Sequence, residues 1–210
     1  AIRTSGSTGQ PVTVLHTPSS RIMFALLKQR ELRWFDWRPD RTLASVRAPA
    51  DLGISSRTHE TFAGEKCRHM PAWPWVGNFF KTGPFYGMSC TGPLEIHMDW
   101  LEHVQPDYLM ALASKLEHLM FGYQERSVPA SIQGVLSISQ ELTGKVRERV
   151  ERTMHTAVQQ NYGANEIGII ACRCPESGRY HVHAENCLVE IVDPEGRPCR
   201  PGRKGRLLVT

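Results

Sequence analysis

The sequence predicts an α/β protein in which helices flank a partly parallel sheet, followed by a β-rich C-terminal part. The strongest sign is the alternation of an apolar run at 132–139, an amphipathic segment at 143–154 and a second apolar run at 158–162. From residue 167 onward, short apolar runs are separated by Gly/Pro-rich turns, which is typical of antiparallel strands. We therefore expect an α/β part at 1–166 and a β-rich subdomain at 167–210.

The first half of the chain begins with a short strand and a capped helix. The apolar run 12–15 predicts the strand, and Thr17 followed by Pro18 predicts the N-cap and first residue of a helix. The helix pattern places apolar side chains on one face. These side chains are Ile22, Met23, Leu26 and Leu27.

The middle of the chain mixes clear and unclear signals. Leu43 to Val46 predicts a strand, whereas residues 52–84 show no periodicity and predict an irregular connection. Residues 84–89 predict another short strand. Two helices are expected next, at about 93–103 and 106–121, separated at Pro106.

The composition is that of an ordinary globular protein. Of 210 residues, 40% are hydrophobic and 22% are charged, and the net charge of +4 comes from basic and acidic residues that are mixed along the chain. This charge pattern argues against a nucleic-acid partner, and the absence of an apolar run of about 18 residues argues against a membrane span. Six cysteines without a secretory signal predict reduced thiols and a cytoplasmic location.

A hydroxyl- and glycine-rich loop occupies residues 3–11. Glycine allows backbone N–H groups to converge on an anion, and the hydroxyl groups of Ser5, Ser7 and Thr8 can donate hydrogen bonds to phosphate oxygens. Taken alone, such a stretch is more often a flexible linker than a phosphate-binding loop. It is not a Walker A motif, because no Gly-Lys-Ser/Thr follows Gly9.

Two further motifs lie downstream in a fixed order. Tyr162-Gly163-Ala164-Asn165-Glu166 precedes an apolar run, and the chain then reaches the strand 188–192 and closes on the Gly/Lys/Arg-rich stretch 202–210. Together with the loop, these motifs resemble the adenylate-forming (AMP-binding) superfamily, and most closely its phenylacetate–CoA ligase-like branch. The resemblance spans nearly the whole chain and corresponds to the central part of the family's large domain.

The resemblance implies ATP-dependent activation of a small-molecule carboxylic acid to an acyl-adenylate, with release of pyrophosphate and then transfer to CoA or a carrier-protein thiol. It implies ATP and Mg²⁺ as cofactors and CoA as acceptor, and it leaves a homodimer open. Glu166 would bind Mg²⁺, and Thr8 and Glu166 take the catalytic positions. The residues assigned to nucleotide binding are Thr4, Ser5, Gly6, Ser7, Thr8, Gly9, Ser139, Gln140, Glu141, Tyr162, Gly163 and Asn165.

The sequence departs from the family pattern in several places. A lysine is usual at or just after the loop proline, and here Gln10 and Val12 stand nearby. A threonine commonly precedes the motif glutamate, and here the residue is Asn165. The ribose-binding aspartate, the C-terminal domain with its catalytic lysine and the part before the loop are not in this sequence. We therefore expect these 210 residues alone to be inactive.

A pair of Cys-X-Cys and His-X-His segments predicts either a zinc site or a plain hairpin. With a four-residue turn at 175–178, Cys172 pairs opposite His181, and Cys174 and His183 share their face. Two thiolates and two imidazoles suit tetrahedral zinc, whereas the alternative is a hairpin with buried thiols and surface histidines. Cys67 and His69 are alternative ligands. If zinc is bound and catalysis is lost, the chain would be a non-catalytic interaction module.

Overall fold

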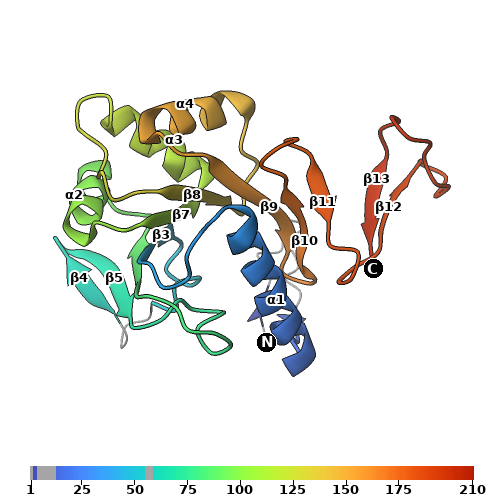
Figure 1. Ribbon diagram of the computed structural model, residues 1–210, viewed down its shortest axis with the longest axis horizontal. Coiled ribbons are helices and arrows are strands. Elements are labelled where there is room, and N and C mark those ends of the chain that lie inside the picture. The colour runs from blue at the N-terminus through green and yellow to red at the C-terminus, as the bar shows by residue number, and fades with distance from the viewer. Residues whose placement is uncertain (1, 4–12, 55–58) are drawn as a thin grey trace. The chain divides into compact units, whose positions relative to one another are not determined.

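The computed structural model describes residues 2–3, 13–54 and 59–210 (Figure 1). The chain divides into two units, one formed by residues 1–27 and 161–210 and the other by residues 28–160. The boundary expected near residue 166 stays a prediction. The predicted phosphate loop, Thr4 to Gly9, lies outside the described residues.

Residues 28–160 are organised around a mixed sheet with a parallel centre. Parallel strands lie side by side in the order β9 (Val158–Ala164, through residues 158–160), β8 (Gly134–Ile138), β7 (Tyr108–Leu112), β3 (Leu43–Arg47) and β6 (Phe85–Ser89). The sheet continues antiparallel through β5 (Glu65–Met70) to β4 (Glu60–Phe62). This arrangement confirms the predicted α/β class.

Three helices cover one face of this sheet (Figure 1). They are α2 (Leu94–Val104), α3 (Ala113–Gly122) and α4 (Gly144–Met154). Their apolar side chains pack in a single core against alternate residues of the strands, each fully buried leucine or valine contributing about 1.5–3 kcal/mol. This core includes Val46, Leu109 and Val135 from the sheet and Leu101, Leu116 and Val150 from the helices.

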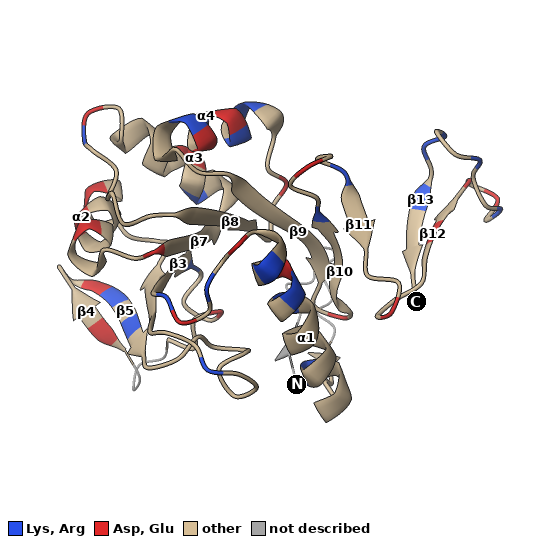
Figure 2. Cartoon of the chain, viewed as in Figure 1, with Lys and Arg blue, Asp and Glu red and all other residues tan. Residues whose placement is uncertain are grey.

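Helix α4 begins as the sequence predicts. The hydroxyl of Thr143 accepts a hydrogen bond from the backbone N–H of Val146 at 3.4 Å, which satisfies one of the free N–H groups of the first turn. The apolar residues Val150 and Met154 are buried, and Figure 2 shows basic and acidic residues intermixed along the same helix. Such mixing is typical of a solvated helix surface.

The helix predicted at 106–121 is wrong in its first half. Residues 108–112 form the central strand β7, and α3 begins only at Ala113. The sequence Tyr-Leu-Met-Ala-Leu is apolar at every position because both faces of a parallel strand are covered, so its periodicity cannot distinguish strand from helix.

The irregular connection predicted at 52–84 is also wrong in part, because it contains the hairpin β4–β5. These strands lie at the sheet edge, where charged side chains such as Glu65, Lys66 and Arg68 stand among apolar ones and hide the pattern.

Helix α1 (Pro18–Trp34) is capped as predicted, since Ser20 N donates to the hydroxyl of Thr17 at 3.1 Å. Its buried residues agree with the prediction only in part. Leu27 is buried, but Ile22 and Leu26 are exposed, and Ala25 is buried in addition. The helix is also longer than its apolar residues indicated, because polar positions such as Glu31 continue it.

Residues 161–210 contain strands and turns, as predicted for the β-rich part. β10 (Gly168–Arg173) pairs antiparallel with residues 161–164 of β9 and with β11 (Tyr180–Val182), and β12 (Val189–Val192) pairs with β13 (Arg206–Val209). Near the N-terminus, β1 (Ile2–Arg3) pairs with β2 (Thr13–Val14). All six cysteines are free thiols. Within the described ranges, no helix is long and apolar enough to cross a membrane.

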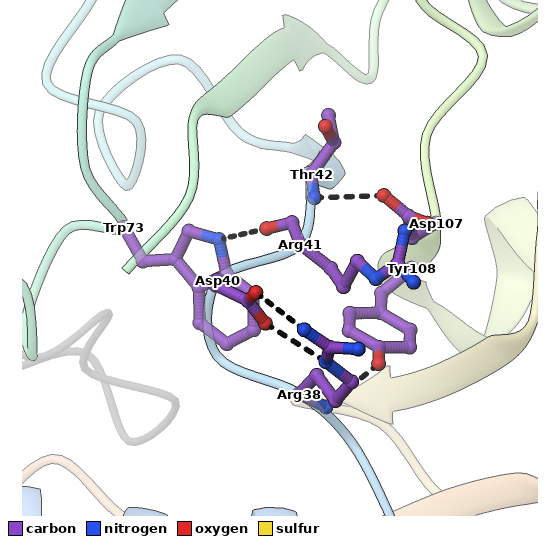
Figure 3. A network of polar contacts seen from close by, with 7 residues as sticks. All are labelled: Arg38, Asp40, Arg41, Thr42, Trp73, Asp107 and Tyr108. Carbon is purple, nitrogen blue, oxygen red and sulfur yellow. Dashed lines mark hydrogen bonds and ion pairs between the residues drawn. The ribbon is translucent and has the colours of Figure 1, made fainter. Parts of the chain in front are cut away.

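A polar network holds the amino edge of the parallel sheet (Figure 3). The carboxylate of Asp107, which precedes β7, accepts a hydrogen bond from Thr42 N at 2.9 Å and lies 3.5 Å from the guanidinium of Arg41. The hydroxyl of Tyr108 accepts from Arg38 N at 2.8 Å, and its ring stacks on Trp37 at 4.1 Å. These contacts fix the entry into β3 against β7.

Candidate functional site

The predicted residues Ser139, Gln140 and Glu141 follow the carboxyl end of β8, which is the edge where open α/β sheets bind ligands. All three are exposed. Ser139 has a φ of 60°, a left-handed conformation that is costly for a residue with a side chain and is often found at functional sites. The turn that it forms brings Gln140 N within 2.8 Å of the carbonyl of Ile138.

The side chain of Gln140 connects this turn to α3. Its Oε1 accepts a hydrogen bond at 2.9 Å from the backbone N–H of Ser114, in the first turn of that helix. The first N–H groups of a helix lack partners within the helix, so this side chain supplies one from the neighbouring strand. The ends of β7 and β8 are therefore held together at the predicted ligand edge.

The predicted Tyr-Gly motif lies at the end of β9. Tyr162 is 49% exposed, which is unusual for a large aromatic residue. A Cβ at Gly163 would lie 2.5 Å from the carbonyl oxygen of Gly168 on the facing strand, so only glycine fits this close approach.

Asn165 and Glu166 form the exposed part of the turn between β9 and β10. The turn closes with a hydrogen bond from Ile167 N to the carbonyl of Ala164 at 3.2 Å. The amide of Asn186 donates to the carbonyl of Ile169 at 3.2 Å and supports the turn from the side of the later chain. The carboxylate of Glu166 is thus held outward on an anchored turn, where it is accessible to a ligand.

The two groups of predicted residues belong to different units. Ser139, Gln140 and Glu141 belong to residues 28–160, and Tyr162 to Glu166 belong to the unit that contains residues 161–210. The structure brings each group together locally. The complete nucleotide-binding set, with Thr4 to Gly9, stays a prediction.

The zinc prediction is confirmed only in its strand register. Cys172 pairs opposite His181, as expected. However, no cluster of three or more potential metal ligands occurs in the part of the chain that the structure describes. The four side chains differ in depth: Cys172 and His183 are buried, Cys174 is half-buried and His181 is exposed. The spacing placed them on one face, but the fold places them at different depths, so zinc is not supported.

The alternative ligands Cys67 and His69 do not rescue a zinc site. Both lie on β5, where Cys67 joins the core and the ring of His69 stacks on that of Tyr86 at 4.6 Å. Burial raises the pKa of the Cys67 thiol. A buried, protonated thiol is a poor metal ligand.

The turn between β10 and β11 holds an activated thiol that the sequence did not reveal. The Sγ of Cys174 interacts with the hydroxyl of Ser177 and lies 3.4 Å from the backbone N–H of the same residue, and these contacts, helped by His181, lower its pKa to about 7. The thiol is therefore substantially ionised near neutral pH. The lowered pKa of Cys174 depends on contacts within the turn, and no sequence motif marks these contacts.

Two buried basic side chains beside the ligand edge were also missed. Lys115 is in the first turn of α3, and His97 is fully buried in α2. The residue types gave no signal, because a lysine and a histidine inside amphipathic segments are ordinarily exposed.

The profile of the AMP-binding enzyme family matches residues 2–210, so the chain belongs to this family. No curated protein matches it.

Solved structures show the same fold. An open conformation of 2-hydroxyisobutyryl-CoA ligase, in complex with 2-HIB-AMP and CoA, matches with a TM-score of 0.71 and 14% identity, over 99% of this chain and 46% of that protein. O-succinylbenzoate coenzyme A synthetase (MenE) from Bacillus subtilis, in complex with AMP, matches with a TM-score of 0.69 and 16% identity, over 99% and 39%. The luciferase-like enzyme of the nonluminescent Zophobas morio mealworm matches with a TM-score of 0.65 and 17% identity, over 99% and 46%. The chain spans less than half the length of each of these proteins.

Proposed function

We propose that the protein containing this chain activates a carboxylic acid with ATP, forming an acyl-adenylate and releasing pyrophosphate. The observation that carries this proposal is the match of the AMP-binding enzyme family to residues 2–210. The exposed Ser139 turn at the carboxyl edge of β8 and the anchored Glu166 turn support it, because both present polar groups where a nucleotide could be held.

The proposed roles follow the family resemblance. Thr4 to Gly9 would hold the β- and γ-phosphates, with Thr8 contacting the transferred groups, and Tyr162 would lie against the adenine. Ser139, Gln140 and Glu141 would line the nucleotide site. In-line attack on a phosphate depends on positioning and on stabilisation of developing charge rather than on a protein nucleophile.

Glu166 is the proposed Mg²⁺ ligand. Its exposed carboxylate fits this role, because Mg²⁺ is usually held by one or two carboxylates together with substrate phosphates rather than by an all-protein cage. The bound ion would neutralise phosphate charge. The role of this chain would be to present the carboxylate on a turn that the hydrogen bonds of Ala164 and Asn186 hold in place.

We further propose that a thiol, CoA or that of a carrier protein, accepts the acyl group, and that the protein resembles the phenylacetate–CoA ligase branch. Two structural neighbours, a CoA ligase in complex with 2-HIB-AMP and CoA and a coenzyme A synthetase in complex with AMP, support the class of acceptor. The branch rests on the motif order 3–11, 162–166 and 202–210. That the 210 residues alone do not turn over remains part of the proposal.

Carboxylate-dependent exchange of ³²P-pyrophosphate into ATP tests the activation step in the native polypeptide that contains these residues. Exchange with any member of a panel of aryl and acyl acids is the expected result. Glu166→Gln should lower it about 10²–10³-fold, the range found when one group that stabilises transition-state charge is removed. Glu176→Gln, another exposed turn glutamate, is the matched control and should leave the rate unchanged. Absence of exchange across the panel would refute the proposed activity, and a normal rate in Glu166→Gln would remove Glu166 from the site.

A further inference from the structure

Positive charge is concentrated in the second half of the connection between β12 and β13 (Figure 2). Five of the chain's 25 basic residues fall within residues 197–206, a stretch that contains no acidic residue and is called the basic loop below. In α4, by contrast, glutamates stand among the basic residues. All five basic residues of the loop are exposed, and they are Arg197, Arg200, Arg203, Lys204 and Arg206.

The acidic residues that precede the basic loop neutralise only one of its cations. The guanidinium of Arg197 lies 3.0 Å from the carboxylate of Asp193 and 2.9 Å from that of Glu195. In the described part of the chain, no ion pair and no side-chain hydrogen bond involves any of the other four cations. Four positive charges therefore create an unbalanced field that attracts an anionic partner.

Backbone contacts hold the basic loop in a defined shape. Cys199 N donates to the carbonyl of Ile191 at 2.7 Å, and Arg203 N donates to that of Arg200 at 3.1 Å. The turn before the loop is closed as well, because Asp193 N donates to the carbonyl of Arg197 at 2.9 Å. A surface that is ordered before binding loses less conformational entropy when a partner docks.

An apolar strip adjoins the basic loop. Opposed residues of β12 and β13 lie on the same face of the hairpin, and on one face Val189 and Val209 pack into a small core. Closer to the loop on that face, Ile191 is 39% exposed and Leu207 is half-buried, whereas Glu190 lies on the other face. Apolar residues beside arginines are typical of protein interfaces, in which arginine is enriched.

The basic loop differs from the sites that bind other anions. A site for single-stranded nucleic acid supplies aromatic side chains on which bases stack, and residues 188–210 contain none. Sites for small molecules are concave and enclose most of the ligand, whereas every basic side chain of this loop is exposed. The surface is therefore better suited to an acidic protein than to a nucleic acid or to the phosphates of a small molecule.

The hairpin is attached to the turn that carries the proposed Mg²⁺ ligand. Val189 and Val209, at its base, pack with Ala164 and Ile167, the residues on either side of the Glu166 turn. All of them belong to the unit that contains residues 161–210. The four residues of β12 span about 10–13 Å, so a partner on the basic loop is held within a short distance of that turn.

We propose that the basic loop, with Ile191 and Leu207, is the docking surface for an acidic carrier protein whose thiol accepts the activated acyl group. This inference rests on the proposed function and selects the carrier-protein thiol rather than CoA as acceptor. In the transfer step, the sulfur of the carrier thiol bonds to the acyl carbon and the bond from that carbon to the phosphate oxygen breaks. AMP leaves with the bonding electrons, and the thiol proton passes to solvent. A small, charged surface suits such a partner, because it must dissociate after each transfer.

The test measures acyl transfer by the native polypeptide to a holo-acyl carrier protein, to CoA and to pantetheine, which has the thiol arm without protein or phosphate. Arg203→Gln combined with Lys204→Gln should lower kcat/KM for the carrier protein about 3–10-fold at about 10 mM salt. The difference should disappear near 1 M salt, where the Debye length is about 3 Å. Transfer to pantetheine and pyrophosphate exchange should stay within about twofold of the wild type, because neither needs the docked protein.

Lys145→Gln combined with Arg152→Gln is the matched control, because it removes one exposed lysine and one exposed arginine from α4. It should behave as the wild type, and both double variants should unfold at the wild-type urea concentration. Three results would overturn the proposal: no transfer to the carrier protein by the wild type, an equal loss in both double variants, or an equal loss with CoA and the carrier protein. The last result would indicate a site for the phosphates of CoA.

A separate binding measurement distinguishes failure of the docking surface from failure of the proposed activity. If no acid supports pyrophosphate exchange in the wild type, the proposed activity fails. Calorimetric titration with the holo-acyl carrier protein at low salt then decides on the surface alone. Binding that is weakened by Arg203→Gln with Lys204→Gln and kept in the α4 control supports the surface. Binding that is absent, or equal in all three proteins, overturns it.

Discussion

Ser139→Gly should stabilise the protein, because the left-handed conformation of Ser139 is unfavourable for a residue with a side chain. The conformation costs about 1–2 kcal/mol for a residue with a Cβ, and the greater freedom of glycine in the unfolded chain takes back about 0.5–1 kcal/mol. Ser139→Gly should therefore raise the free energy of unfolding by about 0.5–1 kcal/mol, or the melting temperature by about 1–4 °C for a chain of this size. His155, which ends α4 with a φ of 51°, is the matched control, and His155→Gly should give the same gain.

Urea unfolding followed by tryptophan fluorescence measures the free energy of unfolding, and pyrophosphate exchange measures the effect of the substitution on activity. A glycine at residue 139 makes the backbone of the turn more flexible. The next residue, Gln140, then holds its hydrogen bond with Ser114 N less firmly. We therefore expect Ser139→Gly to be more stable but slower, and His155→Gly to be more stable and equally fast. If His155→Gly is stabilised and Ser139→Gly is not, the left-handed turn at Ser139 is not strained. An unchanged exchange rate in Ser139→Gly would remove the turn from the site.

Two further predictions concern the amino-edge network and the activated thiol. Asp107→Ala should lower the free energy of unfolding by about 1.5–3 kcal/mol, because Thr42 N loses a charged acceptor, whereas Arg41→Ala should cost less than about 1 kcal/mol for a half-exposed ion pair. Equal effects in urea unfolding would contradict this division. The rate of Cys174 alkylation by iodoacetamide, followed by mass spectrometry, should rise with pH to half its maximum near pH 7, since the pKa of this thiol is lowered to about 7 by Ser177 and His181. A midpoint near that of a free thiol, about 8.5, would refute the role of the turn.

The elements that could be predicted are those whose signal is local. Thr143 caps α4 because its hydroxyl and the following turn are close in sequence, and the register of Cys172 with His181 follows from the length of one turn. The strand β7 could not be predicted, because its apolar run reflects helices and loops on both faces of the sheet that are distant in sequence. The hairpin β4–β5 was hidden for the opposite reason, since an edge strand keeps charged residues in contact with water.

In the candidate site, too, local features could be predicted and features that depend on distant parts of the chain could not. The positions of Ser139 to Glu141 and of Asn165 and Glu166 could be anticipated, because each group directly follows a predicted strand and strand ends define the ligand edge. The strained φ of Ser139 and the bond from Gln140 to Ser114 were not visible, since they depend on how the end of β8 meets α3. The zinc prediction failed because a shared face in the pleat says nothing of depth: Cys172, on the inner strand β10, is buried, whereas His181, its partner on the edge strand β11, is exposed.

Lys115 shows how an error in one element also hid the burial of a side chain. A continuous helix at 106–121 would place Lys115 in the middle of a helix, where a charged residue ordinarily faces solvent. Because β7 takes the first half of that segment, the helix begins at Ala113, and the lysine moves into a first turn that lies above the carboxyl edge of the sheet. Lys115 is only 9% exposed there, whereas Lys145, in the first turn of α4, is exposed. The depth of a first-turn lysine therefore depends on what its helix packs against, which the sequence around it does not reveal.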